Sequence, residues 1–126
     1  MLPFLIADDS PGKMLMLQAF LKKAQWEGEV LTAETAEEAE EIVEEHPEIG
    51  FAFIDYYIPS KNGPWIIRML KTKNPTARIA LVTSSERKDN QEEAIAAGAE
   101  KCICTSYEAE IVEREVMNVL SEWVGK

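Results

Sequence analysis

The hydrophobic positions of this chain form short apolar runs that alternate with segments of helical periodicity. The runs cover residues 2–7, 29–33, 51–55, 79–83 and 101–104. Each has the length of a β-strand, and the run at 51–55 is apolar on both faces, which is typical of a central parallel strand. The pattern therefore predicts five strands, each followed by a helix.

Local sequence signals mark where several of the intervening helices begin and end. Ser10 and Pro11 favour a helix start, Thr35 and Glu38 form a capping box, and Gly98 suits the left-handed position that ends a helix. Helices are also expected over 65–73, 90–97 and 108–123, and the turn-rich segment YYIPSKNGP is expected to be a loop. Five β-α units in strict alternation predict an α/β fold, with a parallel sheet covered by helices on both faces.

Composition narrows the class of protein. The 126 residues are the length of one domain, and 46% hydrophobic with 29% charged residues is normal for a globular protein. The formal net charge of -10 disfavours nucleic acid as a direct partner. No stretch is apolar enough to span a membrane or to serve as a secretory signal, and Cys102 and Cys104 are poorly spaced for a disulfide. We therefore expect a cytoplasmic protein with no membrane partner.

Three carboxylates follow two of the predicted strands and are the candidate chemistry of the chain. Asp8 and Asp9 end the first run, and Asp55 ends the third. Ligands of parallel sheets bind beyond the carboxyl ends of the strands, so these acids are expected to converge there. A divalent cation such as Mg²⁺ would neutralise them, and one carboxylate could act as a nucleophile toward a phosphoryl group. The alternative is structural, with the acids capping a helix or forming a turn.

The order of these features resembles the receiver domain of bacterial two-component response regulators over essentially the whole chain. The matching residues are Asp8, Asp9, Asp55, Pro59, Gly63 and Thr83. The resemblance implies a flavodoxin-like sheet of order 2-1-3-4-5 and one receiver domain over residues 1–126, with no output domain. It also implies a stand-alone regulator of the chemotaxis or phosphorelay kind, which signals by protein-protein contact and catalyses at most its own phosphorylation and dephosphorylation.

Carried over to this chain, the resemblance assigns a role to each site residue. Asp55 would accept a phosphoryl group from a histidine kinase or a phosphotransfer protein. Asp8, Asp9 and Asp55 would hold Mg²⁺ together with the main-chain carbonyl of Tyr57. Thr83 would donate its hydroxyl to a phosphoryl oxygen, although Thr83 could also belong to a polar loop. A downstream protein would then read the phosphorylated state.

The chain departs from the family pattern at the end of the fifth run. Thr105 stands where the family has a lysine, and Ser106 stands where it has a proline whose peptide bond is usually cis. Without that lysine, we expect a stronger dependence on a metal or a raised pKa on one of the three acids. Candidate replacements for the missing cation are Lys61, Arg87, Lys88 and Lys101. A trans bond is expected between Thr105 and Ser106.

Two further positions bear on signalling. Cys102 aligns with the aromatic switch residue of the family and is too small to reproduce its swing, while Tyr107 could fill part of that space. Tyr57 lies at a position that governs water access to the phosphoryl group, so its ring is expected to slow self-dephosphorylation. These departures leave open a degenerate receiver that acts as a phosphorylation-independent interaction module. An aspartate-nucleophile phosphatase is disfavoured, because Tyr57 occupies the place of its usual second acid.

Overall fold

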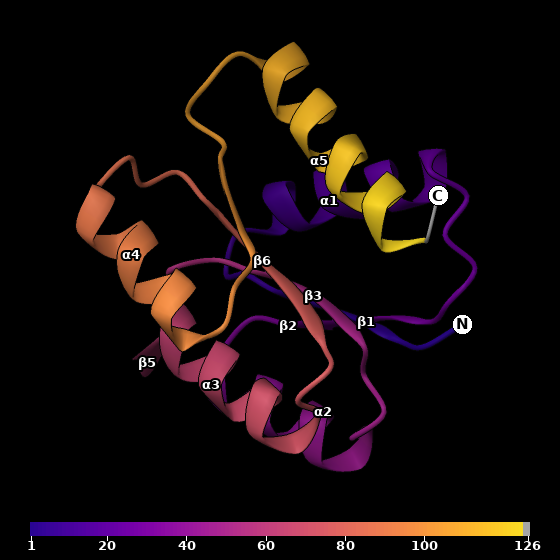
Figure 1. Ribbon diagram of the computed structural model, residues 1–126, viewed down its shortest axis with the longest axis vertical. Helices are drawn as coiled ribbons and strands as arrows, with labels where there is room; N and C mark the ends of the chain where they lie inside the picture. The colour runs from indigo at the N-terminus through magenta and orange to yellow at the C-terminus, as the bar shows by residue number, and fades with distance from the viewer. Residues whose placement is uncertain (125–126) are drawn as a thin grey trace.

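The computed structural model describes residues 1–124, which form a central parallel sheet between two layers of helices (Figure 1). The five strands of the sheet are β1 (Phe4–Ala7), β2 (Val30–Ala33), β3 (Phe51–Ile54), β6 (Arg78–Thr83) and β7 (Lys101–Cys104). Their order is β2-β1-β3-β6-β7, and every neighbouring pair is parallel. The predicted α/β fold and the flavodoxin-like strand order are confirmed.

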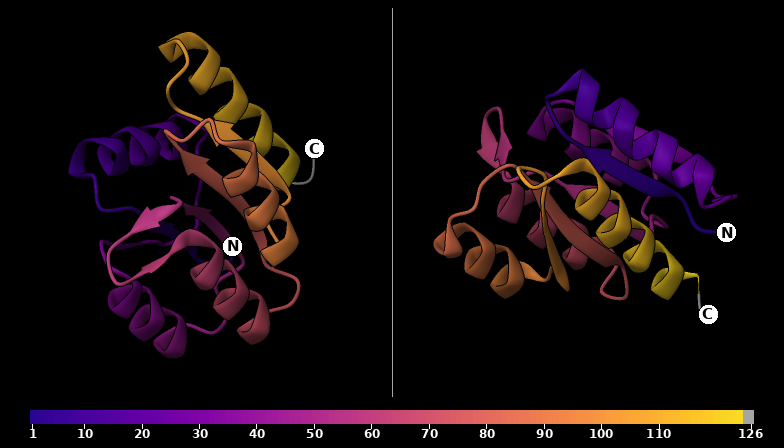
Figure 2. Two further views of the ribbon diagram at one scale, coloured as in Figure 1. Left: turned by 90° about the vertical axis from the view of Figure 1, so that its left-hand side faces the viewer. Right: turned by 90° about the horizontal axis from the view of Figure 1, so that it is seen from above.

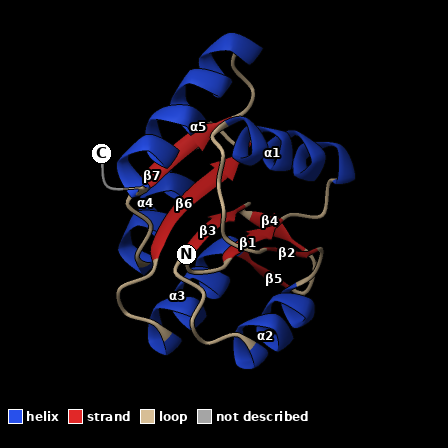
Figure 3. Ribbon diagram, turned by 90° about the vertical axis from the view of Figure 1, so that its right-hand side faces the viewer, coloured by secondary structure: helices blue, strands red, loops and turns tan. Residues whose placement is uncertain are grey.

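The helices cover both faces of the sheet (Figure 3). One face is covered by α1 (Pro11–Lys23) and α5 (Ala109–Trp123). The other is covered by α2 (Ala36–Glu45), α3 (Gly63–Lys73) and α4 (Lys88–Ala97). Since each strand is followed by a returning helix, all five strands end at the same edge of the sheet. That common edge holds the residues of interest.

The capping signals read from the sequence operate as expected. The Ser10 hydroxyl accepts a hydrogen bond from the Lys13 backbone N–H at 3.3 Å and so caps α1. The Thr35 hydroxyl accepts from the Glu38 N–H at 3.1 Å at the start of α2. The Glu38 carboxylate reaches one residue beyond the cap and accepts from the Glu34 N–H at 2.7 Å. These bonds satisfy backbone donors that a helix start otherwise leaves free.

An aromatic cluster occupies the core between the sheet and the helices α1 and α5. It consists of Phe4, Trp26, Phe51, Phe53 and Trp123, with ring centroids 4.8–6.2 Å apart in the pairs that touch. Phe4 contacts the other four rings and is fully buried. Such aromatic pairs add stabilisation beyond the apolar area they bury. The core on the α2, α3 and α4 side is built mainly of aliphatic residues.

The segment that follows β3 differs from the prediction. The expected loop contains a two-stranded antiparallel hairpin, in which β4 (Tyr57–Ile58) pairs with β5 (Lys61–Asn62) (Figure 2). Ser60 at the turn adopts a left-handed φ of 81°. Ile58 is buried against the aliphatic core, and this burial fixes the hairpin. Turn-rich composition alone does not reveal that contact.

Candidate functional site

Three carboxylates meet at the carboxyl edge of the sheet. Asp8 and Asp9 follow β1, Asp55 follows β3, and these strands are direct neighbours in the sheet. One carboxylate oxygen from each residue lies within 4.8 Å of the others. Asp8 is buried, Asp55 is mostly buried and Asp9 is exposed to solvent. The structure therefore brings together the three acids that the sequence singled out, with an arrangement of oxygen ligands that suits a hard divalent cation.

Backbone hydrogen bonds fix the orientation of the two less exposed carboxylates. The Asp55 Oδ1 atom accepts a hydrogen bond from the Tyr56 N–H at 2.8 Å. The Asp8 Oδ1 atom accepts one from the Ser10 N–H at 2.9 Å. No hydrogen bond within residues 1–124 reaches the second oxygen of Asp55. That oxygen is therefore free of hydrogen-bond partners in the described part of the chain.

Lys13 contributes a cation that the sequence analysis missed. Its ammonium lies 2.9 Å from Asp8 Oδ2 and 3.3 Å from Asp55 Oδ1, and it also donates to the carbonyl of Val82 on β6. The Lys13 side chain is only 13% exposed. The signal in the sequence was the position of Lys13 in the first turn of α1, because helical side chains lean toward the helix N-terminus. Here that direction leads back over the ends of the strands.

The four basic residues expected as replacements do not occupy this place. Lys61 lies over the Trp65 ring, with its ammonium 5.5 Å from the ring centroid. Arg87 pairs with Asp89, and Lys88 is exposed at the start of α4. Lys101 begins β7 and therefore lies at the opposite edge of the sheet. Among the described residues, Lys13 is the only base that forms ion pairs at this site, and it forms them with Asp8 and Asp55.

Burial perturbs one of the three acids. Loss of hydration raises the pKa of Asp8 above its ordinary value, and the neighbouring Asp55 carboxylate acts in the same direction. The hydrogen bond and the charge of Lys13 oppose this increase without cancelling it. A raised pKa on one acid was among the two consequences expected from the missing strand-end lysine. The structure supports it for Asp8.

Thr83 lies on the next strand of the same edge. The register pairs Ile54 on β3 with Leu81 on β6, so Thr83 comes one residue beyond the level of Asp55. Thr83 is buried, and its hydroxyl accepts a hydrogen bond from the Ser85 N–H at 3.2 Å. This hydroxyl retains its own hydrogen as a donor. A phosphoryl oxygen on Asp55 would be a suitable acceptor.

The similarity of the chain to known proteins agrees with this geometry. Residues 4–114 match the family model described as the response regulator receiver domain. The chain belongs to this family. Receiver domains are the signalling input modules of two-component systems, and they bind a divalent metal at an acidic pocket. No curated protein sequence matches the chain.

Solved structures of receiver domains share the fold at low sequence identity. The Mn²⁺-bound form of response regulator Rcp1 has a TM-score of 0.85 and 16% identity, with 100% of this chain and 96% of that chain covered. A CheY-like receiver domain protein from Methanospirillum hungatei JF-1 has a TM-score of 0.82 and 21% identity, with 98% and 93% covered. The BeF3-activated DrrB receiver domain has a TM-score of 0.73 and 23% identity, with 96% and 98% covered. None of the described helices could cross a membrane.

The loop that departs from the usual receiver sequence is held by its own contacts. Thr105 is half-buried after β7, and its backbone N–H donates to the Thr83 carbonyl at 2.9 Å. The Ser106 hydroxyl donates to the Glu86 carboxylate at 2.6 Å, which ties this loop to the one that precedes α4. No peptide bond within the described residues is cis, as expected for Thr105-Ser106.

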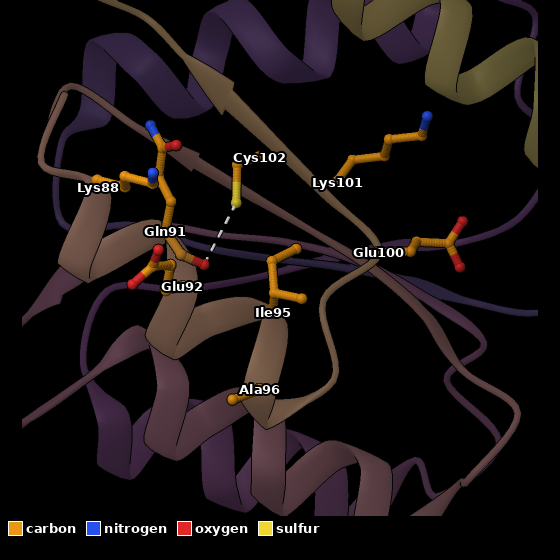
Figure 4. Close-up of a pocket in the computed structure, with 8 residues that line it drawn as sticks. All are labelled: Lys88, Gln91, Glu92, Ile95, Ala96, Glu100, Lys101 and Cys102. Carbon is orange, nitrogen blue, oxygen red and sulfur yellow. Dashed lines mark hydrogen bonds between the residues drawn. The ribbon is translucent and has the colours of Figure 1, made fainter.

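Cys102 faces α4 in a shallow groove of this receiver domain (Figure 4). Its thiol lies 3.8 Å from the carbonyl of Gln91, and burial raises the pKa of the Cys102 thiol. Tyr107 is 52% exposed, so it does not fill the buried space that an aromatic residue at position 102 would take. The residues that line the groove beside Cys102 do not include Tyr107, so the structure does not support that expectation.

Two tyrosines connect the loop after Asp55 to α4. The Tyr56 hydroxyl donates to the Glu93 carboxylate at 2.7 Å, and this hydrogen bond raises the pKa of Tyr56. The Tyr57 hydroxyl accepts from the Asn90 amide at 3.1 Å. The two rings meet edge to face with centroids 5.0 Å apart. The backbone beside the candidate acceptor is thereby joined directly to the helix that borders the Cys102 groove.

Proposed function

We propose that this receiver domain accepts a phosphoryl group on Asp55 from a histidine kinase or a phosphotransfer protein. The observation that carries the proposal is the convergence of the Asp8, Asp9 and Asp55 carboxylates within 4.8 Å at the carboxyl edge of the sheet. In the proposed site these three residues hold Mg²⁺ together with the main-chain carbonyl of Tyr57. The exposed Asp9, which forms no ion pair within residues 1–124, supports such a role.

The chemistry assigned to the chain is nucleophilic attack by a carboxylate. The second oxygen of Asp55 forms a bond to phosphorus, the bond between phosphorus and the donor atom breaks, and the donor keeps that electron pair. Asp55 Oδ1, held by the Tyr56 N–H, becomes the carbonyl oxygen of the acyl phosphate. Bound Mg²⁺ would neutralise charge on the phosphoryl oxygens. Thr83 would donate its hydroxyl to one of these oxygens.

Signalling would follow from a change in the contacts around the acceptor. A phosphoryl group adds charge and strong hydrogen-bond acceptors to a packed loop, which can shift a two-state element. Cys102 lacks the bulk for the usual aromatic switch. We therefore place the route to α4 in the bonds from Tyr56 to Glu93 and from Tyr57 to Asn90. A downstream protein would read the altered surface.

Tyr57 is assigned a second role, in the lifetime of the acyl phosphate. Its ring is 53% exposed and lines the same surface pocket as Asp9. A bulky ring at this place hinders the approach of water to the phosphoryl group. We expect Tyr57→Asn to shorten the half-life of the phosphorylated protein, measured by intact mass after removal of the donor. An equal or longer half-life would refute this role.

The proposed function is tested by phosphorylation with acetyl phosphate and Mg²⁺, read by intact mass. We expect the parent protein to gain one phosphoryl group and Asp55→Asn to gain none. Asp89→Asn is the matched control, because Asp89 is an exposed aspartate whose ion-pair distance to Arg87 is 3.6 Å. Loss of acceptance in the control as well would show that the assay does not report on Asp55. A folded parent that gains no phosphoryl group would refute the proposal.

Cys102 favours a second function, that of a phosphorylation-independent interaction module. The residue leaves a groove between α4 and β7 where the family carries an aromatic switch residue, so this surface could engage a partner in a single constitutive state. The acetyl phosphate experiment separates the two functions. A parent protein that binds its target equally well with and without the donor would favour the module.

A further inference from the structure

We propose that Lys13, on helix α1, supplies the ammonium that contacts the phosphoryl group, in place of the strand-end lysine that receiver domains usually carry. The inference rests on the proposed acceptance of a phosphoryl group by Asp55. At the usual lysine position this chain has Thr105, whose short side chain carries no charge. The positive charge of the site therefore comes from a different element of the fold.

The Lys13 ammonium contacts three acceptor oxygens. It donates a hydrogen bond to the Val82 carbonyl and forms ion pairs with Asp8 Oδ2 and Asp55 Oδ1. These acceptors belong to the ends of β1, β3 and β6, three adjacent strands of the sheet. The ammonium thus lies at the centre of the carboxyl edge. It also lies next to Thr83, since Val82 is the preceding residue.

The position of Lys13 in the helix argues that the site requires its charge. The first turn of α1 contains no acidic residue, and a positive charge near a helix N-terminus is electrostatically unfavourable. The long lysine side chain also loses rotational freedom when it is held in one place. Both effects oppose this arrangement in the absence of a compensating partner. The carboxylates of Asp8 and Asp55 provide that compensation.

The charge count leaves room for a divalent cation beside Lys13. Three carboxylates and one ammonium leave two negative charges. Asp9 makes no ion pair in the described part of the chain, and its ligand oxygen remains within 4.8 Å of those of Asp8 and Asp55. Lys13 therefore complements the proposed metal and does not take its place. The two cations are nevertheless expected to compete in part, because both interact with Asp8 and Asp55.

Phosphorylation would give the ammonium a stronger partner. Attack by the second oxygen of Asp55 breaks the bond from phosphorus to the donor, and Asp55 Oδ1 becomes a neutral carbonyl oxygen. The Lys13 ammonium, 3.3 Å from that atom, then lies beside a group that carries almost two negative charges. Lysine binds phosphate well as a point charge. Lys13 is thus assigned direct contact with a phosphoryl oxygen.

The test compares Lys13→Met with Lys22→Met, both saturated with Mg²⁺ and given acetyl phosphate. Lys22 is an exposed lysine of the same helix and serves as the matched control. Loss of a charged contact to the reacting group is expected to slow phosphorylation by roughly 10–100-fold in Lys13→Met. The control should keep the parent rate. A Lys13→Met protein that is folded and phosphorylated at the parent rate would overturn the inference.

The affinity for Mg²⁺ distinguishes contact with the phosphoryl group from a purely structural role. Removal of the competing ammonium is expected to tighten Mg²⁺ binding to Lys13→Met, measured by calorimetry without a phosphodonor, while phosphorylation becomes slower. Damage to the fold would weaken both. Weaker Mg²⁺ binding together with slower phosphorylation would therefore overturn the inference in favour of a structural role.

A double variant tests whether Lys13 takes the place of the strand-end lysine. Lys13→Met combined with Thr105→Lys is expected to recover most of the parent rate of phosphorylation, and failure to recover it would overturn this assignment. The proposed function fails separately. If the parent protein accepts no phosphoryl group, both proposals are refuted, whereas an active parent with an equally active Lys13→Met refutes only the role of Lys13.

Discussion

Gly63 lies against the backbone of the proposed acceptor, and replacing it with alanine should displace that backbone. A Cβ atom at position 63 would lie 2.2 Å from the Asp55 carbonyl oxygen and 3.0 Å from the Tyr56 Cα atom. The Gly63 N–H also donates to the Tyr56 carbonyl at 2.8 Å, so the two segments cannot separate freely. To reach even a 3.0 Å contact, the close-packed backbone must move by about 0.8 Å.

The expected effect on stability follows from two opposing contributions. Overpacking of this kind destabilises a protein by about 1–3 kcal/mol, and the upper part of that range applies because backbone atoms cannot rotate away. Replacing a helical glycine with alanine returns about 1 kcal/mol at most. We expect Gly63→Ala to lower the free energy of unfolding by about 1–2 kcal/mol, which corresponds to a fall in Tm of roughly 3–8 °C.

Gly12→Ala is the matched control, because Gly12 lies in the first turn of α1 and a Cβ there meets no atom within 4 Å. We expect this variant to be more stable than the parent by about 0.5–1 kcal/mol. Urea unfolding followed by tryptophan fluorescence measures both variants. An equal increase in the free energy of unfolding for Gly12→Ala and Gly63→Ala would refute the reasoning. It would show that the backbone of Asp55 accommodates the added methyl group without loss of stability.

Three further outcomes are expected. Burial opposes ionisation of Glu100, yet its hydrogen bonds to Arg78 and Trp123 lower its pKa overall. The ionised Glu100 therefore stabilises the fold at pH values above its unfolded-state pKa of about 4.5. This stabilisation is lost as the pH falls through the lowered pKa of the folded state. Glu100→Gln should therefore lose about 0.5–1 kcal/mol of stability at pH 7 and less at pH 3, measured by urea unfolding; a loss that does not change with pH would contradict this origin. Because burial raises the pKa of Cys102, its alkylation by iodoacetamide at pH 7 should be slower than that of free cysteine, and a faster reaction, followed by peptide mass, would contradict this expectation. Tyr56→Phe should increase amide hydrogen exchange along α4, while unchanged exchange would argue against the proposed coupling.

The sequence predicted the convergence of Asp8, Asp9 and Asp55 because strand ends determine it. Once two apolar runs are parallel neighbours, the residues that follow them must meet at one edge. Neither the conformation of the side chains nor their contacts is needed for this conclusion. The layers of helices were predictable from the strict alternation of five β-α units, which allows few topologies. The strand order came from the resemblance to receiver domains.

The sequence did not predict the role of Lys13, because that role depends on contacts between distant segments. The replacements expected from the sequence were Lys61, Arg87, Lys88 and Lys101, because a sequence alone does not place side chains. The direction of the Lys13 side chain follows from the exact register of the first turn of α1, and helix boundaries read from sequence are uncertain by two or more residues. The hairpin formed by β4 and β5 was missed for a related reason. Its short strands are stabilised by the burial of Ile58, which only the folded core provides.

The three tryptophans of the protein divide between two environments and can therefore act as separate optical reporters. Trp26 and Trp123 belong to the aromatic cluster beneath α1 and α5, with rings close to Phe4 and Phe51. Trp65 lies on the opposite side of the sheet at the start of α3, where the Lys61 ammonium covers its ring. Lys61 lines the same surface pocket as Asp9. A spectral change when a cation binds would thus originate from Trp65, while Trp26 and Trp123 would report the integrity of the core.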